Sequence, residues 1–291
     1  NRIYKQIYFR CRNGTRVSSA TAFLRPARDR SNLHVMLNST ATKVLLETTG
    51  DQKTISAVEF IYNDTTFTVQ VNREAIVSGG SINSPQLLLL SGIGPKNELD
   101  KVGIEQVHDL PGVGQNLHNH VSFGMNFNLN LVKNTNDLDW LAALNYFTHR
   151  TGPLTYTGIS EVAARLTTKY GDPAGDDPDL QLVFEGLSAT CCRTCAVGEL
   201  ADPDNPDSRK SIRITSDNIK PKSRGYIGLH TSNPLDAPLM QPNYLAEADD
   251  VKILIEGIRV IQSLGNTTVL REKYGTELIK ENYGDCEEQY T

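Results

Sequence analysis

The residue types that most often act in catalysis or bind metals are thinly spread through this chain of 291 residues. Its six histidines are His34, His108, His118, His120, His149 and His230. His118-Asn119-His120 places two imidazoles two residues apart, but a metal site needs further ligands, and none follows nearby in the sequence. The histidines alone therefore indicate no metal centre and identify no general base.

The five cysteines form one cluster, Cys191, Cys192 and Cys195, and two distant singles, Cys11 and Cys286. Cys-Cys-x-x-Cys lacks a fourth Cys or His at the spacing of a zinc site, so we expect no bound metal. Disulfides are compatible with this set, but the sequence does not give their pairing.

Glycine-rich turns are a second place where chemistry could lie, because they bring backbone amides close to a cofactor. No Gly-x-Gly-x-x-Gly dinucleotide motif occurs anywhere in the chain. Gly112-Val113-Gly114 begins like one, but Leu117 stands at the position of the third glycine. We therefore read this run as a turn and not as a phosphate loop.

The stretch Gly80–Gly94, GSINSPQLLLLSGIG, is the most informative of these turns. The apolar run 75–77 before it predicts a buried strand that stops at Ser78-Gly79-Gly80. Ser84 is a suitable N-cap with Pro85 at the first helical position, which predicts a short buried helix over 86–90. Gly92 and Gly94 supply the left-handed or close-approach backbone that leaves the helix, and a second helix is expected over 96–102.

From these residues alone, an ordinary α/β unit whose glycines only make turns is as good an interpretation as a cofactor-binding turn.

Composition and charge limit the kinds of molecule that we expect the chain to bind. With 38% hydrophobic and 22% charged residues, the chain has the make-up of a soluble globular protein. A net charge of −5 gives no reason to expect nucleic acid. The longest apolar run, near residues 87–90, is far shorter than the roughly 20 residues that span a bilayer.

The elements around the glycine stretch indicate mixed architecture. Strands are expected at 33–37 and 42–46, followed by a hairpin of 55–62 and 67–71 turning at Asn63-Asp64. A strand over 123–131 and a helix over 138–147 follow. A well-marked helix opens at Asp249-Asp250 and closes at Gly265. Its expected apolar face comprises Val251, Leu254, Ile255, Ile258, Ile261 and Leu264.

Two motifs carry a family resemblance. Gly80–Gly94 is similar at every position to the second signature of the glucose–methanol–choline (GMC) flavoprotein oxidoreductases, and Asp109–Leu117 resembles their Leu-Pro-Gly-Val-Gly-x-Asn-Leu run. Residues 13–35 resemble the segment that leads into the later strands of the flavin domain. Asn119 stands where the family normally has Asp, so a salt bridge of that Asp is in doubt. Within the family the chain resembles the insect glucose dehydrogenase branch, through residues 179–181 and 197–200.

The resemblance implies α/β plus α+β architecture: part of an FAD-binding Rossmann-like domain with a β-meander, then an antiparallel-sheet substrate domain with helices. We expect residues 1–120 to be a partial FAD-binding domain and 121–291 the substrate-binding domain. The implied reaction transfers a hydride from the CH–OH group of an alcohol, or a sugar such as glucose, to FAD, with quinone or oxygen as electron acceptor. Because the chain starts at Asn1 without Met, we expect an internal fragment.

The resemblance also implies particular site residues. Val44 matches the valine whose backbone contacts the adenine of FAD, and Gly79 and Gly80 lie on the cofactor side of the glycine stretch. Glu161 falls where some family members have a pocket-lining residue, although a surface or helix-capping glutamate is the more common role for such a residue. The catalytic histidine of the family is expected beyond Thr291, so no catalytic residue is assigned. A lyase on the same scaffold and a catalytically silent binding or structural protein remain open.

Four N-glycosylation sequons occur, at Asn13, Asn38, Asn63 and Asn266. With 22 asparagines in the chain, about three sequons would arise by chance. They are compatible with the extracellular location that the insect branch implies, and they do not argue for it.

Overall fold

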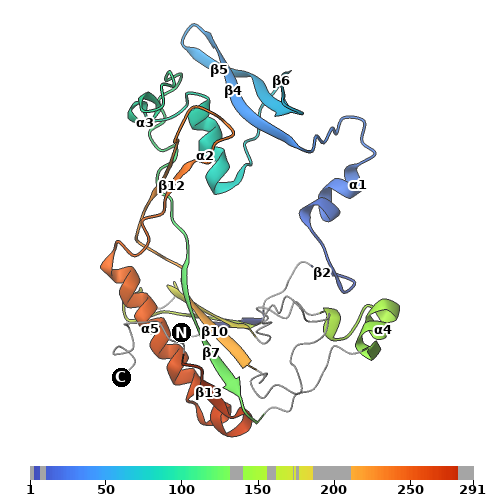
Figure 1. The fold of residues 1–291 in the computed structure, drawn as a ribbon, viewed down its shortest axis with the longest axis vertical. Helices are drawn as coiled ribbons and strands as arrows, with labels where there is room; N and C mark the ends of the chain where they lie inside the picture. The colour runs from blue at the N-terminus through green and yellow to red at the C-terminus, as the bar shows by residue number, and fades with distance from the viewer. Residues whose placement is uncertain are drawn as a thin grey trace. The chain divides into compact units, whose positions relative to one another are not determined.

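The computed structural model describes residues 3–6, 11–131, 140–155, 162–172, 174, 177–185 and 211–280 (Figure 1). The chain divides into two compact units. The sheet unit contains residues 1–28, 120–221 and 248–291, and the α2 unit contains 29–119 and 222–247. The chain passes between the units after residues 28, 119, 221 and 247, so both units are discontinuous in sequence. The expected functional division into 1–120 and 121–291 stays a prediction.

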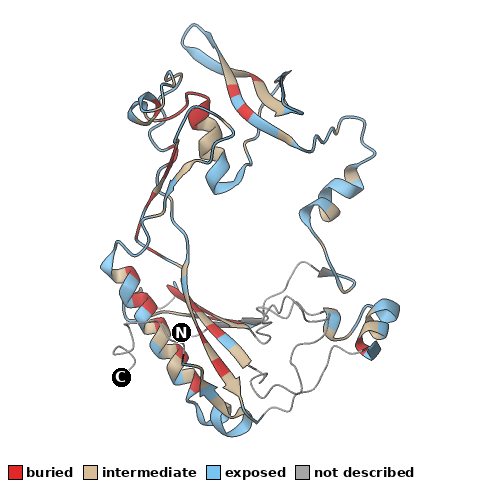
Figure 2. Ribbon diagram, viewed as in Figure 1, coloured by how far each residue is buried: buried red, intermediate tan, exposed pale blue. Residues whose placement is uncertain are grey.

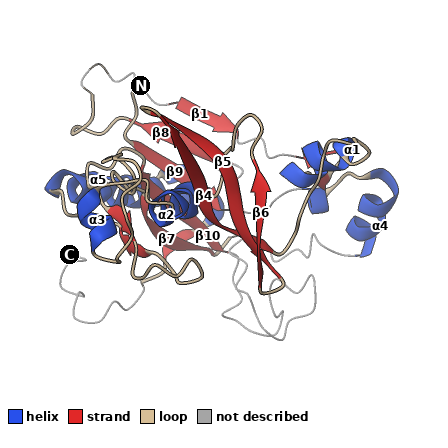
Figure 3. Ribbon diagram, turned by 90° about the horizontal axis from the view of Figure 1, so that it is seen from above, coloured by secondary structure: helices blue, strands red, loops and turns tan. Residues whose placement is uncertain are grey.

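A six-stranded antiparallel sheet forms the sheet unit, in the order β1-β8-β9-β10-β7-β13. Figure 3 labels all of these strands except β13. Its strands are β1 (Ile3–Gln6), β7 (Val121–Leu129), β8 (Val162–Leu166), β9 (Leu180–Glu185), β10 (Ser211–Asn218) and β13 (Thr276–Leu278). β7 forms because Phe123, Met125 and Phe127 alternate with small or polar residues, which gives the strand one apolar face. The strand expected over 123–131 is thereby confirmed.

One helix, α5 (Ala248–Gly265), packs on this sheet. Leu254 and Ile261 are buried as predicted, and Ile258 and Leu264 pack against the same core. The prediction was wrong for Val251 and Ile255, which are 37% and 42% exposed. The stripe that faces the sheet is instead made of Asp250, Ile253, Leu254, Gly257, Ile261 and Gly265.

The glycines of α5 explain that rotation of the buried face. A Cβ on Gly257 would lie 2.8 Å from Ser216 Cβ, and a Cβ on Gly265 would overlap the ring of Phe127. The absence of side chains at these two positions lets the helix backbone lie directly on the strands. Phe127 and Leu180, which lie opposite these glycines, belong to the buried core of the sheet unit together with Leu182 and Ile214.

Smaller elements complete the sheet unit. They are β2 (Cys11–Arg12), β3 (Thr15–Arg16), the helical turns η1 (Ala20–Leu24), η2 (Pro153–Thr155) and η3 (Val269–Tyr274), and the helices α1 (Arg25–Ala27) and α4 (Trp140–His149). α4 confirms the helix expected over 138–147. Ala142 is buried, but most of the large apolar side chains of α4 are exposed, with Trp140 at 88% and Phe147 at 69% (Figure 2). No described helix is long and apolar enough to cross a bilayer.

The α2 unit combines an antiparallel meander, two helices and a strand pair. The meander is β4 (Ser39–Thr49), β5 (Gln52–Tyr62) and β6 (Thr65–Gln70), the helices are α2 (Gly80–Leu90) and α3 (Lys96–Asp100), and the pair is β11 (Tyr226–Gly228) and β12 (Leu239–Gln241). The predicted hairpin with its Asn63-Asp64 turn is confirmed, and both turn residues have positive φ. The short helix after Pro95 is also confirmed, ending before Gly103.

Two predicted strands are absent from this unit. Residues 33–37 and 75–77 form no strand, and Ile76 is 80% exposed. A continuous apolar run becomes a buried strand only between two neighbouring strands. The described residues supply no such neighbours for 75–77, so its apolar composition does not produce burial here.

Candidate functional site

The candidate site is built around α2, in the stretch that carries the family motif. The helix begins at Gly80, four residues before the predicted Ser84 cap, so Pro85 lies inside the helix and not at its first position. No side chain caps its start, where Gly79 stands at φ −74° and Gly80 at φ +85°. Residues 78–83 are exposed, and a Cβ on Gly80 would meet nothing within 4 Å. The backbone of this turn is therefore open to close approach.

The other end of α2 is tied to the meander through Ser91. The Ser91 Oγ–H donates to the carbonyl oxygen of Leu87 at 2.6 Å, and the same Oγ accepts from the backbone N–H of Val44 at 2.8 Å. Ser91 and Val44 are 1% and 3% exposed. The N–H of Val44, a residue expected to contact adenine, is thus already hydrogen-bonded within the chain.

The two glycines after the helix are required by close packing, as predicted. Gly92 has φ +75°, and a Cβ there would lie 2.5 Å from the carbonyl oxygen of Glu105. The Gly92 carbonyl accepts from the N–H of Val107 at 2.8 Å, and the Gly94 N–H donates to the His108 carbonyl at 3.1 Å. These bonds dock residues 104–108 against the exit from α2, where Ile93 and His108 form an isolated parallel bridge.

The second family motif, 109–117, packs against β11. Gly114 has φ +78°, and a Cβ on it would overlap the carbonyl oxygen of Ile227, whose N–H donates to the Gly114 carbonyl at 2.6 Å. Leu117 and Gly225 exchange two backbone hydrogen bonds of 2.9 and 2.7 Å. Gly114 therefore permits contact between two backbone segments, which is a physical reason for this glycine that needs no nucleotide.

The substitution at Asn119 has a neutral partner. Its Nδ2 donates to the hydroxyl of Tyr244 at 3.3 Å, and His118 Nδ1 lies 2.8 Å from the carbonyl oxygen of Asn116. Arg224 Nε donates to Asn116 Oδ1 at 2.8 Å, so the end of the motif is joined to the segment before β11. In the described part of the chain these histidines form no cluster of three or more potential metal ligands.

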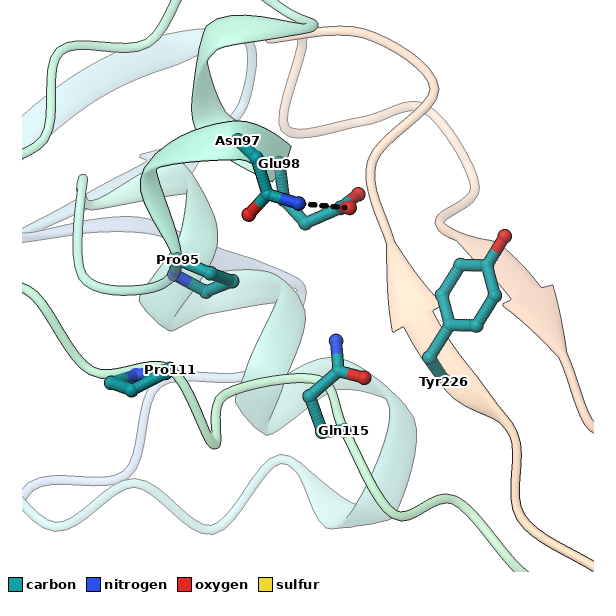
Figure 4. Close-up of a pocket in the computed structure, with 6 residues that line it drawn as sticks. All are labelled: Pro95, Asn97, Glu98, Pro111, Gln115 and Tyr226. Atoms are coloured by element: carbon teal, nitrogen blue, oxygen red, sulfur yellow. Dashed lines mark hydrogen bonds between the residues drawn. The ribbon is translucent and has the colours of Figure 1, made fainter.

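A cavity of about 450 Å³ lies on the α2 unit (Figure 4). Its lining residues are Pro95, Asn97, Glu98, Pro111, Gln115 and Tyr226. Glu98 Oε1 accepts from Asn97 Nδ2 at 3.3 Å and from Lys101 Nζ at 2.6 Å. Because that carboxylate is already paired, and because Val44, Gly79 and Gly80 do not line the cavity, the geometry gives it no catalytic role.

The sequence motifs indicated the glycines that close packing requires, but not the segments that pack against them. Val44 and the Gly79-Gly80 pair all belong to the α2 unit, at opposite ends of α2, while Glu161 lies outside the described residues, as do Cys191, Cys192, Cys195 and Cys286. Ser91 was missed as a contact of Val44. The signal for it was present, because Ser91 is the closing serine of the matched motif. Tyr226 in the cavity had no comparable signal.

Known proteins share both motifs and the fold. Sequence profiles of the GMC oxidoreductases match residues 4–122 and 221–290. The chain is 46% identical over 95% of its length to glucose dehydrogenase [FAD, quinone] of Drosophila melanogaster, covering 43% of that protein. It is 33% identical over 92% of its length to alcohol dehydrogenase [acceptor] of Pseudomonas putida, covering 47% of it.

Solved structures agree on the fold. A formate oxidase matches with a TM-score of 0.69 at 21% identity, over 93% of this chain and 48% of that one. A fungal aryl-alcohol oxidase matches with a TM-score of 0.73 at 18% identity, over 94% of this chain and 51% of that one. The chain thus spans about half the length of the proteins it matches. On its two motifs, its fold and these matches, the chain belongs to the GMC oxidoreductase family.

Proposed function

We propose that this chain is part of an FAD-dependent oxidoreductase that oxidises a CH–OH group, in a sugar such as glucose or in another alcohol. The observation that carries the proposal is the 46% identity to a glucose dehydrogenase described as FAD- and quinone-dependent, which extends over 95% of this chain. The electron acceptor in this proposal is a quinone, with molecular oxygen as the alternative.

The described residues fit a flavin nucleotide at the start of α2. Gly79 and Gly80 are exposed, uncapped by any side chain and free of a Cβ, so their backbone can lie against a large cofactor. Val44 would contact adenine through a backbone atom other than its N–H, because that N–H already donates a hydrogen bond to Ser91 Oγ. FAD, when bound, supplies the hydride acceptor; the protein binds and orients it.

The proposed division of labour assigns residues 1–120 to the cofactor and 121–291 to the substrate. β11 and β12 belong to the second of these segments but pack in the same compact unit as α2, so functional and structural boundaries differ there. Glu161 remains a proposed pocket residue on the substrate side. No histidine of this chain is proposed as the catalytic base. We also propose an extracellular location, which rests on the similarity to the insect enzyme alone.

The direct test is to express the full-length protein that contains this chain and to record its visible absorbance. We expect stoichiometric flavin and reduction of an artificial dye by glucose or another alcohol. The matched control is the 291-residue chain alone, which we expect neither to retain FAD nor to turn over sugar. A colourless full-length protein would overturn the proposal and favour a silent binding protein. Bound flavin with cyanohydrin cleavage and no dye reduction would favour a lyase.

A further inference from the structure

One end of the β4–β5–β6 meander brings together two sequons that are 25 residues apart in the chain. Ser39 at the start of β4 pairs with Tyr62 at the end of β5, so Asn38 and Asn63 flank the same end of the sheet. Both asparagines occupy turns with positive φ, 55° and 47°. The topology thus places two sequons next to each other at one end of the meander.

The side chains at this end are available for modification. Asn38 and Asn63 are exposed, and neither amide nitrogen has a hydrogen-bond partner among the residues that the structure describes. Other exposed asparagines differ: Nδ2 of Asn119, Asn233 and Asn243 donates to a neighbouring oxygen. A group attached to Asn38 or Asn63 would therefore displace no internal contact, whereas one on those three would break a hydrogen bond.

Both sites also carry the required acceptor sequence and lie away from the proposed cofactor contact. Thr40 and Thr65 stand two residues after the asparagines, as Asn-x-Thr sequons require. Val44 is six residues along β4 from Asn38, which at about 3.3 Å per residue is roughly 20 Å. A bulky group on this end of the sheet is compatible with FAD at the other elements of the unit.

We propose that Asn38 and Asn63 carry N-linked glycans, so that this end of the meander is a solvent-facing surface and not an interface. In the transfer, Asn Nδ2 forms a bond to the anomeric carbon of a lipid-diphosphate-linked oligosaccharide. That carbon loses its bond to the diphosphate, Nδ2 loses a proton, and the lipid diphosphate leaves. The inference rests on the extracellular location proposed above.

The other two sequons are also exposed but have different surroundings. A Cβ on Gly14, next to Asn13, would overlap the backbone oxygen of Arg150. Asn266 lines a cavity of about 250 Å³ together with Arg271 and Glu277. The proposal concerns only Asn38 and Asn63, which share one end of the meander.

The test uses the full chain, expressed in eukaryotic cells behind a foreign secretion leader and with a tag that contains its own sequon. Peptide N-glycosidase treatment in heavy-oxygen water converts each glycosylated asparagine to labelled aspartate, which mass spectrometry locates. We expect the label at Asn38 and at Asn63. On a denaturing gel, N38Q and N63Q should each run faster by the mass of one glycan, and the double variant by the mass of two. T40A and T65A should each lose one glycan although the asparagine is intact, whereas T40S and T65S should keep it.

The tag separates failure of this inference from failure of secretion. When the tag carries a glycan, the chain has passed the transferase whatever its natural location. An unlabelled Asn38 or Asn63 on such a chain would overturn the proposal for that residue. Asn116 and Asn243, which also have positive φ but no sequon, are internal controls that must stay unlabelled.

Discussion

α2 and α5 are both rich in apolar residues, yet different parts of each helix fix its position. α5 runs for 18 residues and buries one continuous stripe against the sheet. α2 has apolar side chains on all sides, but only Leu89 and Leu90, at its C-terminal end, are buried. α5 is thus fixed by a face and α2 by one end, where Ser91 and Gly92 make specific contacts. Apolar content alone does not tell a helix that is buried along one face from a helix whose first turn stays exposed.

The largest effect should come from the buried stripe of α5. Ile261 is fully buried, so Ile261→Ala should lower the free energy of unfolding by about 3–5 kcal/mol. Ile255 on the same helix is 42% exposed, and Ile255→Ala should cost less than about 1 kcal/mol. Urea unfolding followed by circular dichroism measures both. Equal losses would show that the stripe does not fix α5.

Next in size is the exit from α2. Gly92→Ala should destabilise by about 2–4 kcal/mol, because the new Cβ is strained at positive φ and must displace the Glu105 carbonyl. Gly103 has φ +70° with nothing within 4 Å, so Gly103→Ala should cost only the strain, about 1–2 kcal/mol. The same urea titration compares them. A Gly103 variant as unstable as the Gly92 variant would refute close packing as the cause.

The smallest effect concerns the serine that joins α2 to β4. Ser91→Ala leaves the buried N–H of Val44 without its acceptor, which should cost about 1–2 kcal/mol. Ser81 is exposed on the same helix, and Ser81→Ala should change stability by less than about 0.5 kcal/mol. Indistinguishable midpoints for the two variants would mean that the end of α2 is held by other contacts.

Local patterns predicted the elements whose own residues decide their structure. The period of α5, the alternation of β7 and the Asn63-Asp64 turn all gave the observed element with nearly the observed bounds. The buried face of α5 was less predictable, because a pattern of apolar residues is recognised by its large side chains and gives glycine no weight. The closest approach to the sheet is instead along Gly257 and Gly265, which carry no side chain for such a pattern to register.

Burial that depends on a distant segment was not predictable. Residues 75–77 have the composition of an internal strand, but no neighbouring strand covers them in the described part of the chain. The contact between Ser91 and Val44 joins residues 47 positions apart, so no local spacing reveals it. At the candidate site, the family motif identified the glycines, whereas the atoms that surround them are known only from the structure.

The Ser91–Val44 bond also has a consequence for solvent exchange. β4 is an edge strand of its meander, and those of its amide protons that do not bond β5 can exchange with water without unfolding. The Val44 amide is protected instead, because its acceptor is a hydroxyl buried at the end of α2. Exchange at this amide requires that hydrogen bond to open, so this single proton reports how firmly the end of α2 is held against β4.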